Sequence, residues 1–325
     1  MKNIKHFLDL IKKSQHIVIS THIHPDADGI GSQIALCMAL KSLKKDAYCV
    51  NEEKLLDRYS YLDNNNYLLS FNEYQKKCSK IIPDLTIIVD TNHIARIGPN
   101  LEKIAAKSKD FIFIDHHPCP KEVAAIHLID TKMAATGELV AVLLEKLGVA
   151  YNKDLALPLY TAILIDTNCF RYPNVTFHTH KIVSDLMQSG VAPASAYNSI
   201  YGTKKIHHMK LLGQILSQAE TNKDESVAWI TLTEEMIKKN NSDIEDTHSF
   251  INHLLILDNV KVSCMFRETG KFIKVSLRST GTTDVGTMAQ ALGGGGHDHS
   301  AATIIEGGLE DVIKNTIRKI EIMLK

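Results

Sequence analysis

The first half of the chain alternates short apolar segments with longer amphipathic ones. The apolar segments predict buried strands at residues 16–21, 85–89 and 111–114. The amphipathic segments predict helices at residues 30–43, 134–147, 157–166 and 179–189, after an opening helix that carries Ile4, Phe7, Leu8 and Ile11 on one face. Strands that alternate with helices are typical of a mostly parallel sheet with helices on both faces, so the pattern predicts an α/β fold.

The pattern changes after residue 190. Glycine, proline and small residues fill positions 190–195, and a helical stretch at 204–220 follows. Beyond it, we predict strands at 227–233, 260–267, 272–278 and 301–305, and helices at 283–292 and near the C-terminus. A length of 325 residues suits two domains of roughly 100–200 residues each. We expect an α/β domain at residues 1–190, a helical linker at 191–220 and a smaller mixed-sheet α/β domain at 221–325.

Composition excludes several classes of protein. The 37 Lys and Arg residues balance the 37 Asp and Glu residues, so the chain lacks the basic field that attracts long nucleic acid. No apolar run approaches the ~20 residues of a membrane span, and we predict no signal peptide. The six cysteines are scattered without a C-x-x-C pair, which argues against a disulfide framework. We expect a cytoplasmic protein that binds neither membranes nor long duplexes.

Acidic and imidazole side chains follow the predicted strands and the apolar run at 162–165. They are, in chain order, His22, Asp26 and Asp28; Asp90; Asp115, His116 and His117; and Asp166. Because the carboxyl ends of parallel strands meet at one edge of a sheet, these side chains can converge. Taken alone, Asp26, Asp28 and Gly29 also fit a turn with a helix cap.

A cluster of this kind predicts a metal site. Closely packed carboxylates repel one another, whereas divalent cations bind them in the ionised form. A set of carboxylates and imidazoles without a thiolate favours Mn²⁺, with Mg²⁺ or Fe²⁺ as alternatives.

Five segments carry a resemblance to a known family: HIHPDADGIGS, VDT, DHH, LIDT and GGGGH, in this order. Together they resemble the DHH family of phosphoesterases, and within it the NrnA-like nano-RNases and pAp phosphatases with their DHH-associated second domain. The resemblance covers nearly the whole chain. It implies a hydrolase that cleaves very short RNA and linear dinucleotides such as pApA to mononucleotides, and 3′-phosphoadenosine 5′-phosphate (pAp) to AMP and phosphate.

The resemblance also implies roles for the motif residues. Two divalent metal ions would share one carboxylate, with His22 and Asp26 on the first ion, Asp28, His116 and Asp166 on the second, and Asp90 on both. As catalytic residues, His117 would face the scissile phosphate and Asp115 would orient its neighbours. Paired cations of this kind activate water and stabilise the oxygens of the reacting phosphoryl group.

A run of four glycines precedes His297 near the C-terminus. Such a run either ends a helix or lets backbone amides approach an anion. The run and a strand arginine are similar to the nucleotide-binding elements of DHH-associated domains, which implies a substrate site formed by Arg278, Gly294, Gly295, Gly296 and His297. Asp298 and His299 replace the small neutral residues typical of the family, so the base or length preference stays open.

Other polar residues have two interpretations. Arg96 and Arg171 follow predicted ligands and fit either a substrate phosphate or a structural ion pair. We interpret His24 as a loop residue, and we expect His207 and His208 on solvated helix faces.

Three alternative functions remain. The first is an inorganic pyrophosphatase or polyphosphatase, although the second half has no comparable basic motif. The second is a RecJ-like exonuclease on long single strands, which a 6% aromatic share and balanced charge disfavour. The third is a nucleotide-binding sensor that has lost catalysis. A homodimer is compatible with each of them.

Overall fold

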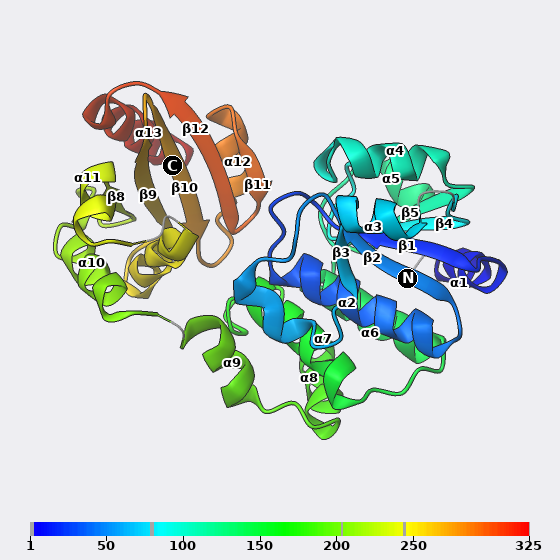
Figure 1. Cartoon of the computed structure of the whole chain (residues 1–325). Coiled ribbons are helices and arrows are strands. Elements are labelled where there is room, and N and C mark those ends of the chain that lie inside the picture. The colour runs from blue at the N-terminus through cyan, green and yellow to red at the C-terminus, as the bar shows by residue number, and fades with distance from the viewer. Residues whose placement is uncertain (1–2, 79–80, 203, 243–244, 325) are drawn as a thin grey trace. The chain divides into compact units, whose positions relative to one another are not determined.

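The computed structural model describes residues 3–78, 81–202, 204–242 and 245–324, with the backbone alone for Glu245, Asp246 and His297. Its contacts divide the chain into two compact units, Met1–Gly202 and Thr203–Lys325 (Figure 1). We describe each unit by itself. The expected domain and linker limits at residues 190 and 221 stay predictions.

The first unit is built on a sheet of six strands in the order β3-β2-β1-β4-β5-β6, which we call sheet A. All of its pairings are parallel. The strands are β1 (His16–Ser20), β2 (Asp46–Asn51), β3 (Leu68–Ser70), β4 (Leu85–Val89), β5 (Asp110–Asp115) and β6 (Leu128–Ile129).

Helices cover both faces of sheet A. They are α1 (Ile4–Lys13), α2 (Ala27–Ser42), α3 (Phe71–Cys78), α4 (Pro99–Lys107), α5 (Lys121–Ile126), α6 (Thr136–Lys146), α7 (Lys153–Asp166), α8 (Phe177–Gln188) and α9 (Pro193–Tyr201), with 3₁₀ turns η1 (Asp57–Leu62) and η2 (Ile94–Arg96). Figure 1 shows α3, α4 and α5 on one face, and α2, α6, α7 and α8 on the other. The layers explain why β1 is apolar at consecutive positions. Ile17 and Ile19 belong to the core under α2, α6 and α7, whereas Val18 belongs to the core under α3 and α4.

Helices α2 and α7 pack closely because of one glycine in the first motif. A Cβ atom on Gly31 would lie 2.3 Å from the carbonyl oxygen of Pro158 in α7. No side chain fits at that distance, so Gly31 permits the contact that holds the start of α2 near the end of α7.

The second unit holds a mixed sheet in the order β11-β12-β10-β9-β8-β7, which we call sheet B. Strands β8 and β9 pair in parallel, and the other neighbours are antiparallel. Its elements are α10 (Ile206–Leu216), β7 (Glu220–Thr221), β8 (Val227–Leu232), α11 (Glu234–Lys239), η3 (Glu245–Ile256), β9 (Val262–Thr269), β10 (Phe272–Ser279), α12 (Val285–Ala291), β11 (Gly295–His297), β12 (Ser300–Glu306) and α13 (Leu309–Met323). One core packs against α12 and α13, and another against α10 and η3.

The expected fold class is confirmed: an α/β unit with a parallel sheet is followed by a smaller mixed-sheet unit. The predicted strands at 16–21, 85–89 and 111–114 correspond to β1, β4 and β5. Sequence analysis did not find β2, β3 or β6, nor the short strands β7 and β11. None of the helices in the described part of the chain combines the length and the apolar composition that a membrane crossing requires.

Candidate metal centre

Three adjacent strands bring the predicted ligands to one edge of sheet A. Strands β1, β4 and β5 are neighbours, and their carboxyl ends lead into His22, Asp90 and the Asp115–His117 motif respectively. Helix α2 begins after the first strand and adds Asp26 at its N-cap and Asp28 in its first turn. Asp166 is the last residue of α7. Side chains up to 144 residues apart in the sequence, from His22 to Asp166, therefore gather at one place.

His116 lies at the centre of one group of ligand atoms. Its Nε2 atom is 3.0 Å from Oδ2 of Asp166, 3.9 Å from Oδ2 of Asp28 and 4.0 Å from Oδ1 of Asp90. The two longer distances exceed the length of a hydrogen bond, and they suit groups that bind the same cation. Asp28, His116 and Asp166 are among the sets whose ligand atoms lie within 4.8 Å of one another.

A second group forms around His22. Its Nε2 atom is 3.4 Å from Oδ2 of Asp90, and Asp26 completes a set within 4.8 Å. The two oxygens of Asp90 thus face different groups, Oδ2 toward His22 and Oδ1 toward His116. Asp26 also caps α2, because its Oδ1 accepts hydrogen bonds from the backbone amides of Asp28 and Gly29. The helix-cap interpretation of Asp26 is therefore correct, and it leaves Oδ2 for the cluster.

Backbone carbonyls orient both imidazoles. Nδ1 of His22 lies 2.9 Å from the carbonyl oxygen of Ile23, and Nδ1 of His116 lies 3.2 Å from that of Met133. A ring that donates from Nδ1 presents its lone pair at Nε2, the atom that points into the cluster in both cases. This arrangement is the usual support of a metal-binding histidine.

Several carboxyl groups of the cluster are buried close together, which disfavours their ionised forms. Asp28 is fully buried and Asp90 is 3% exposed. Burial, reinforced by the charges of neighbouring aspartates, raises the pKa of both carboxyls well above their usual range. Burial alone would lower the pKa of His116, but the charge and hydrogen bond of Asp166 and the charge of Asp28 outweigh it and raise that pKa to about 10. Divalent cations would satisfy the same carboxylates without protons, so the donor set fits a metal.

Asp90 occupies an unusual backbone conformation. Its φ angle is +62°, in the left-handed region that non-glycine residues rarely adopt. Its amide donates to the carbonyl oxygen of Ile114, which ties the end of β4 to β5. Strained residues that the surrounding structure holds in place are typical of functional sites.

Asp115 plays a different part from the other aspartates. It accepts hydrogen bonds from the ring of His117, from the backbone amide of His116 and from Nδ2 of Asn92. Burial raises the pKa of Asp115, but the hydrogen bond and charge of His117 outweigh it, so the net shift is downward. His117 lies at the rim, with its side chain 16% exposed and Nδ1 3.8 Å from Oδ1 of Asp90. The predicted roles of Asp115 and His117 agree with these positions and stay predictions.

Several residues around the centre were missed by sequence analysis. Thr136 and Gly137 at the start of α6 donate backbone hydrogen bonds to Asp28, and Ser32 donates its hydroxyl to the same carboxylate. Asn92 bonds to Asp115. The only signal in the sequence is the small-residue stretch 134–137 before an apolar helix, which marks a helix start but not its partner.

The predicted substrate residues lie in the second unit. Arg278 in β10 pairs with Ser300 in β12, which pairs in turn with His297 in β11, so the register places the three in one row. Nη1 of Arg278 donates to the carbonyl oxygen of Leu277. The side chain of His297 lies outside the described residues.

The sequence suggested that the glycine run is a loop, but part of it forms a strand. Gly295 and Gly296 belong to β11, which pairs with β12. A Cβ atom would lie 2.2 Å from the carbonyl oxygen of Ala302 at Gly294, and 2.4 Å from Cα of Ala301 at Gly296. Close packing on β12 therefore requires glycine at these two positions. A Cβ atom at Gly295 would meet nothing within 4 Å, so packing does not explain that glycine.

One expectation about the histidines was wrong. His208 is 4% exposed, and its ring lies tilted by 58° against that of Phe250 with centroids 4.7 Å apart, because α10 packs on η3. His207, its neighbour, is half-buried, so it is only partly on the solvated face that we expected.

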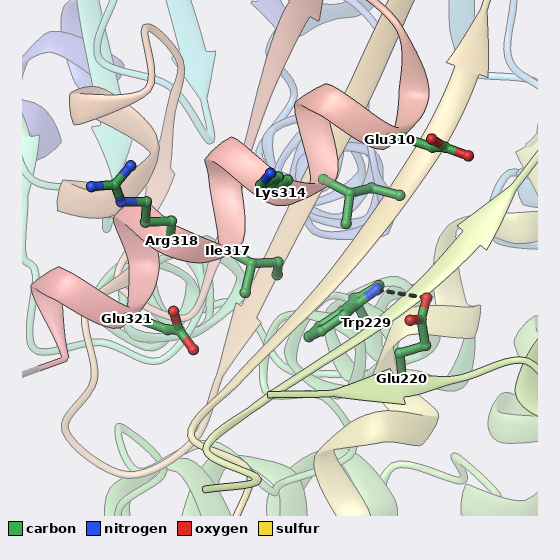
Figure 2. A pocket seen from close by; sticks show the side chains of 8 residues that line it. Glu220, Trp229, Glu310, Lys314, Ile317, Arg318 and Glu321 are labelled. Atoms are coloured by element: carbon green, nitrogen blue, oxygen red, sulfur yellow. Dashed lines mark hydrogen bonds between the residues drawn. The ribbon is translucent and has the colours of Figure 1, made fainter. Parts of the chain in front are cut away.

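A cavity of about 620 Å³ opens elsewhere in the second unit, between α13 and the β7–β8 hairpin (Figure 2). Its lining consists of Glu220, Trp229, Glu310, Ile313, Lys314, Ile317, Arg318 and Glu321. Figure 2 shows the indole N–H of Trp229 bonded to Glu220, its neighbour on the hairpin. The lining includes none of the predicted substrate residues, and its carboxylates outnumber its cations, which disfavours a phosphate ligand.

Comparison with known proteins identifies the family. Residues 16–163 match the N-terminal domain of the DHH family, and residues 197–324 match the DHHA1 domain. The chain belongs to the DHH family. Proteins of this family are phosphoesterases, so the expected enzyme class, a hydrolase of phosphoester bonds, is confirmed.

This DHH protein is similar to characterised relatives over most of its length. It is 29% identical over 293 residues to the bifunctional oligoribonuclease and PAP phosphatase NrnA of Thermus thermophilus, covering 90% of this chain and 84% of the relative. It is 24% identical to the protein of the same name from Bacillus subtilis, covering 86% of each.

Two solved structures share the fold of this DHH protein. The exopolyphosphatase-related protein of Bacteroides fragilis has a TM-score of 0.89 and 30% identity, covering 98% of this chain and 95% of that one. RecJ of Thermus thermophilus in complex with Mn²⁺ has a TM-score of 0.55 and 14% identity, covering 99% of this chain and 55% of that one. The RecJ comparison is a likeness of fold alone.

We predict that the metal-free protein loses stability as pH rises from about 7 to about 8.5. The pKa of His116, raised to about 10 by the charge and hydrogen bond of Asp166, means that the folded state keeps a proton that an unfolded histidine releases above about pH 6.5. The free energy of unfolding then falls with rising pH, by about 1.4 kcal/mol per pH unit for each extra proton. The lowered pKa values of His22 and His127 act in the opposite direction only below about pH 6.5, the unperturbed histidine value.

The measurement is calorimetric unfolding in the presence of a chelator across this pH range. Asp166→Asn serves as the control, since Asp166 is the main group that raises the pKa of His116, and its removal should flatten the slope. A melting temperature of the wild-type protein that rises with pH in this window would show that the cluster does not hold the protons.

Proposed function

We propose that this protein is a metal-dependent phosphoesterase that degrades very short RNA and linear dinucleotides such as pApA to mononucleotides, and converts pAp to AMP and phosphate. The observation that carries the proposal is the orientation of Asp90, whose two oxygens face two separate groups of histidine and aspartate. A carboxylate in that position suits a bridge between two cations.

The proposed ligands follow from this division. One cation would be held by His22, Asp26 and Asp90, and the other by Asp28, Asp90, His116 and Asp166. Mn²⁺ suits this set of oxygen and imidazole donors, and Mg²⁺ or Fe²⁺ are the alternatives. When bound, such cations supply the positive charge that activates water and stabilises the phosphoryl oxygens in hydrolysis.

The chain's own residues would complete the site. His117, at the rim of the cluster and held by Asp115, is placed to meet an oxygen of the substrate phosphate. The ring is held by Asp115 through Nδ1. Asp115 would keep the ring in this orientation.

The substrate class is supported by the relatives. The proteins from Thermus thermophilus and Bacillus subtilis that share most of this chain's length are named for oligoribonuclease and PAP phosphatase activity. The Bacteroides fragilis protein, described as exopolyphosphatase-related, makes inorganic polyphosphate the competing substrate. We further propose that Arg278, the run Gly294–Gly296 and His297 bind the nucleotide portion of the substrate, in a cytoplasmic enzyme that is compatible with a homodimer.

Product analysis tests the substrate. Metal-stripped protein is incubated with pAp, pApA, a five-nucleotide RNA, pyrophosphate or polyphosphate, each with and without Mn²⁺, and the products are separated by chromatography. We expect AMP or mononucleotides only when Mn²⁺ is present, with pyrophosphate and polyphosphate intact. Phosphate release from polyphosphate alone would establish the competing substrate, and tight nucleotide binding without turnover would identify a sensor.

Replacing Asp90 tests the bridging ligand. Asp90→Asn should reduce turnover by more than about 100-fold, since a direct ligand contributes more than the supporting residues whose loss costs 10–100-fold. The metal-free variant should melt no lower than the wild type, because the substitution removes a buried carboxyl from a repulsive cluster. Near-wild-type turnover by the variant would contradict the two-cation arrangement.

Replacing residues of the second unit tests the nucleotide site. Arg278→Ala and Gly295→Ala should each raise KM by roughly 10-fold, about 1.4 kcal/mol of binding, with a smaller effect on kcat. Gly294→Ala differs from these two variants, because its Cβ would collide with β12 and should lower the melting temperature as well. An unchanged KM in Arg278→Ala would exclude it from the site.

A further inference from the structure

Thr136 contacts two carboxylates that belong to different parts of the cluster. Its backbone amide donates to Oδ2 of Asp28 over 2.7 Å, and its hydroxyl donates to Oδ1 of Asp90 over 3.1 Å. The side chain is fully buried. A single residue of α6 thereby links a carboxylate from α2 with one from the end of β4.

The position of Thr136 follows from how α6 begins. The first amides of a helix have no partner within it, and the N-cap residue Ala135 offers no side-chain acceptor. Asp28 supplies the missing acceptors, with Oδ2 for the amide of Thr136 and Oδ1 for the amide of Gly137. Asp28 is therefore fixed by two backbone amides, and any substitution at position 136 other than proline keeps both donors.

Asp90 has no comparable backbone donor on its carboxylate among the described residues. The hydroxyl of Thr136 is its one side-chain hydrogen bond from a neutral donor in this part of the chain. The oxygen that receives it, Oδ1, is the oxygen that lies 4.0 Å from Nε2 of His116, while Oδ2 lies 3.4 Å from Nε2 of His22. Rotation of the carboxylate about its Cβ–Cγ bond would exchange or tilt these two oxygens, and the hydroxyl opposes that rotation.

We propose that Thr136 is a positioning residue that fixes the plane of the Asp90 carboxylate, so that one oxygen stays with each ligand group and both cations bind tightly. The inference rests on the two-cation function proposed above. The hydroxyl need not touch the cations or the substrate. It acts through Asp90, in the way that hydrogen-bonded supporting residues orient the ligands of metal sites.

Three variants separate this role from ordinary structural support. Thr136→Val removes the hydroxyl while keeping the shape and the backbone amide. Thr136→Ser keeps the hydroxyl and removes the methyl group. Thr86→Val is the matched control, because Thr86 is also a fully buried threonine of the first unit whose hydroxyl makes a hydrogen bond, to Ser108.

The test is titration calorimetry of Mn²⁺ binding to the metal-stripped full-length protein, with thermal unfolding measured in chelator. We expect Thr136→Val to weaken Mn²⁺ binding by roughly 10–100-fold, Thr136→Ser to restore it to near the wild-type value, and Thr86→Val to leave it unchanged. In chelator, Thr136→Val and Thr86→Val should lose similar melting temperature, since each removes one buried hydroxyl.

Mn²⁺ affinity in Thr136→Val equal to that of the wild type would overturn the inference, and so would a Thr136→Ser protein as weak as Thr136→Val. If the valine variant does not fold, Thr136→Ala provides the same comparison with the serine variant. A wild-type protein that binds no divalent cation would instead overturn the proposed function itself, which keeps the two failures distinct.

Discussion

The mutual repulsion of buried carboxylates at the carboxyl edge of sheet A is the constraint on which the rest of the first unit depends. Three features of the fold reduce this repulsion. Helix α6 begins where its free amides donate hydrogen bonds to Asp28. Asp115 accepts hydrogen bonds from the ring of His117 and the backbone amide of His116. His116 lies against Asp166. Asp90 accepts a hydrogen bond from the hydroxyl of Thr136, and its buried carboxyl lies on a strained backbone, so cations would stabilise its ionised form.

Much of the fold could be predicted because its central strands are buried on both faces. Strands β1, β4 and β5 are almost continuously apolar, and each ends abruptly in polar residues. Strand β2 was missed because its sequence, DAYCVN, mixes polar and apolar residues, although it is the neighbour of β1 in the sheet. Its burial depends on α2, which packs over it, and a local pattern does not reveal that contact.

The candidate ligands could be predicted for a related reason. Each follows a strand or an apolar helix, and parallel strands carry their ends to the same edge. Thr136 could not be predicted, because its partners Asp28 and Asp90 are 108 and 46 residues away and threonine at a helix start is ordinary. The glycine run illustrates the opposite error. Its composition suggested a loop, whereas the contacts of Gly294 and Gly296 with β12 give two of its glycines a packing role.

The single tryptophan of the chain has a practical consequence. Trp229 belongs to β8 of the second unit, where its indole N–H bonds to Glu220 and its ring packs against the core beneath α13. Intrinsic tryptophan fluorescence therefore originates in the second unit alone, while circular dichroism follows the helices of both. Comparing the two signals during denaturation reports whether the units unfold together or one after the other, with no label added to the protein.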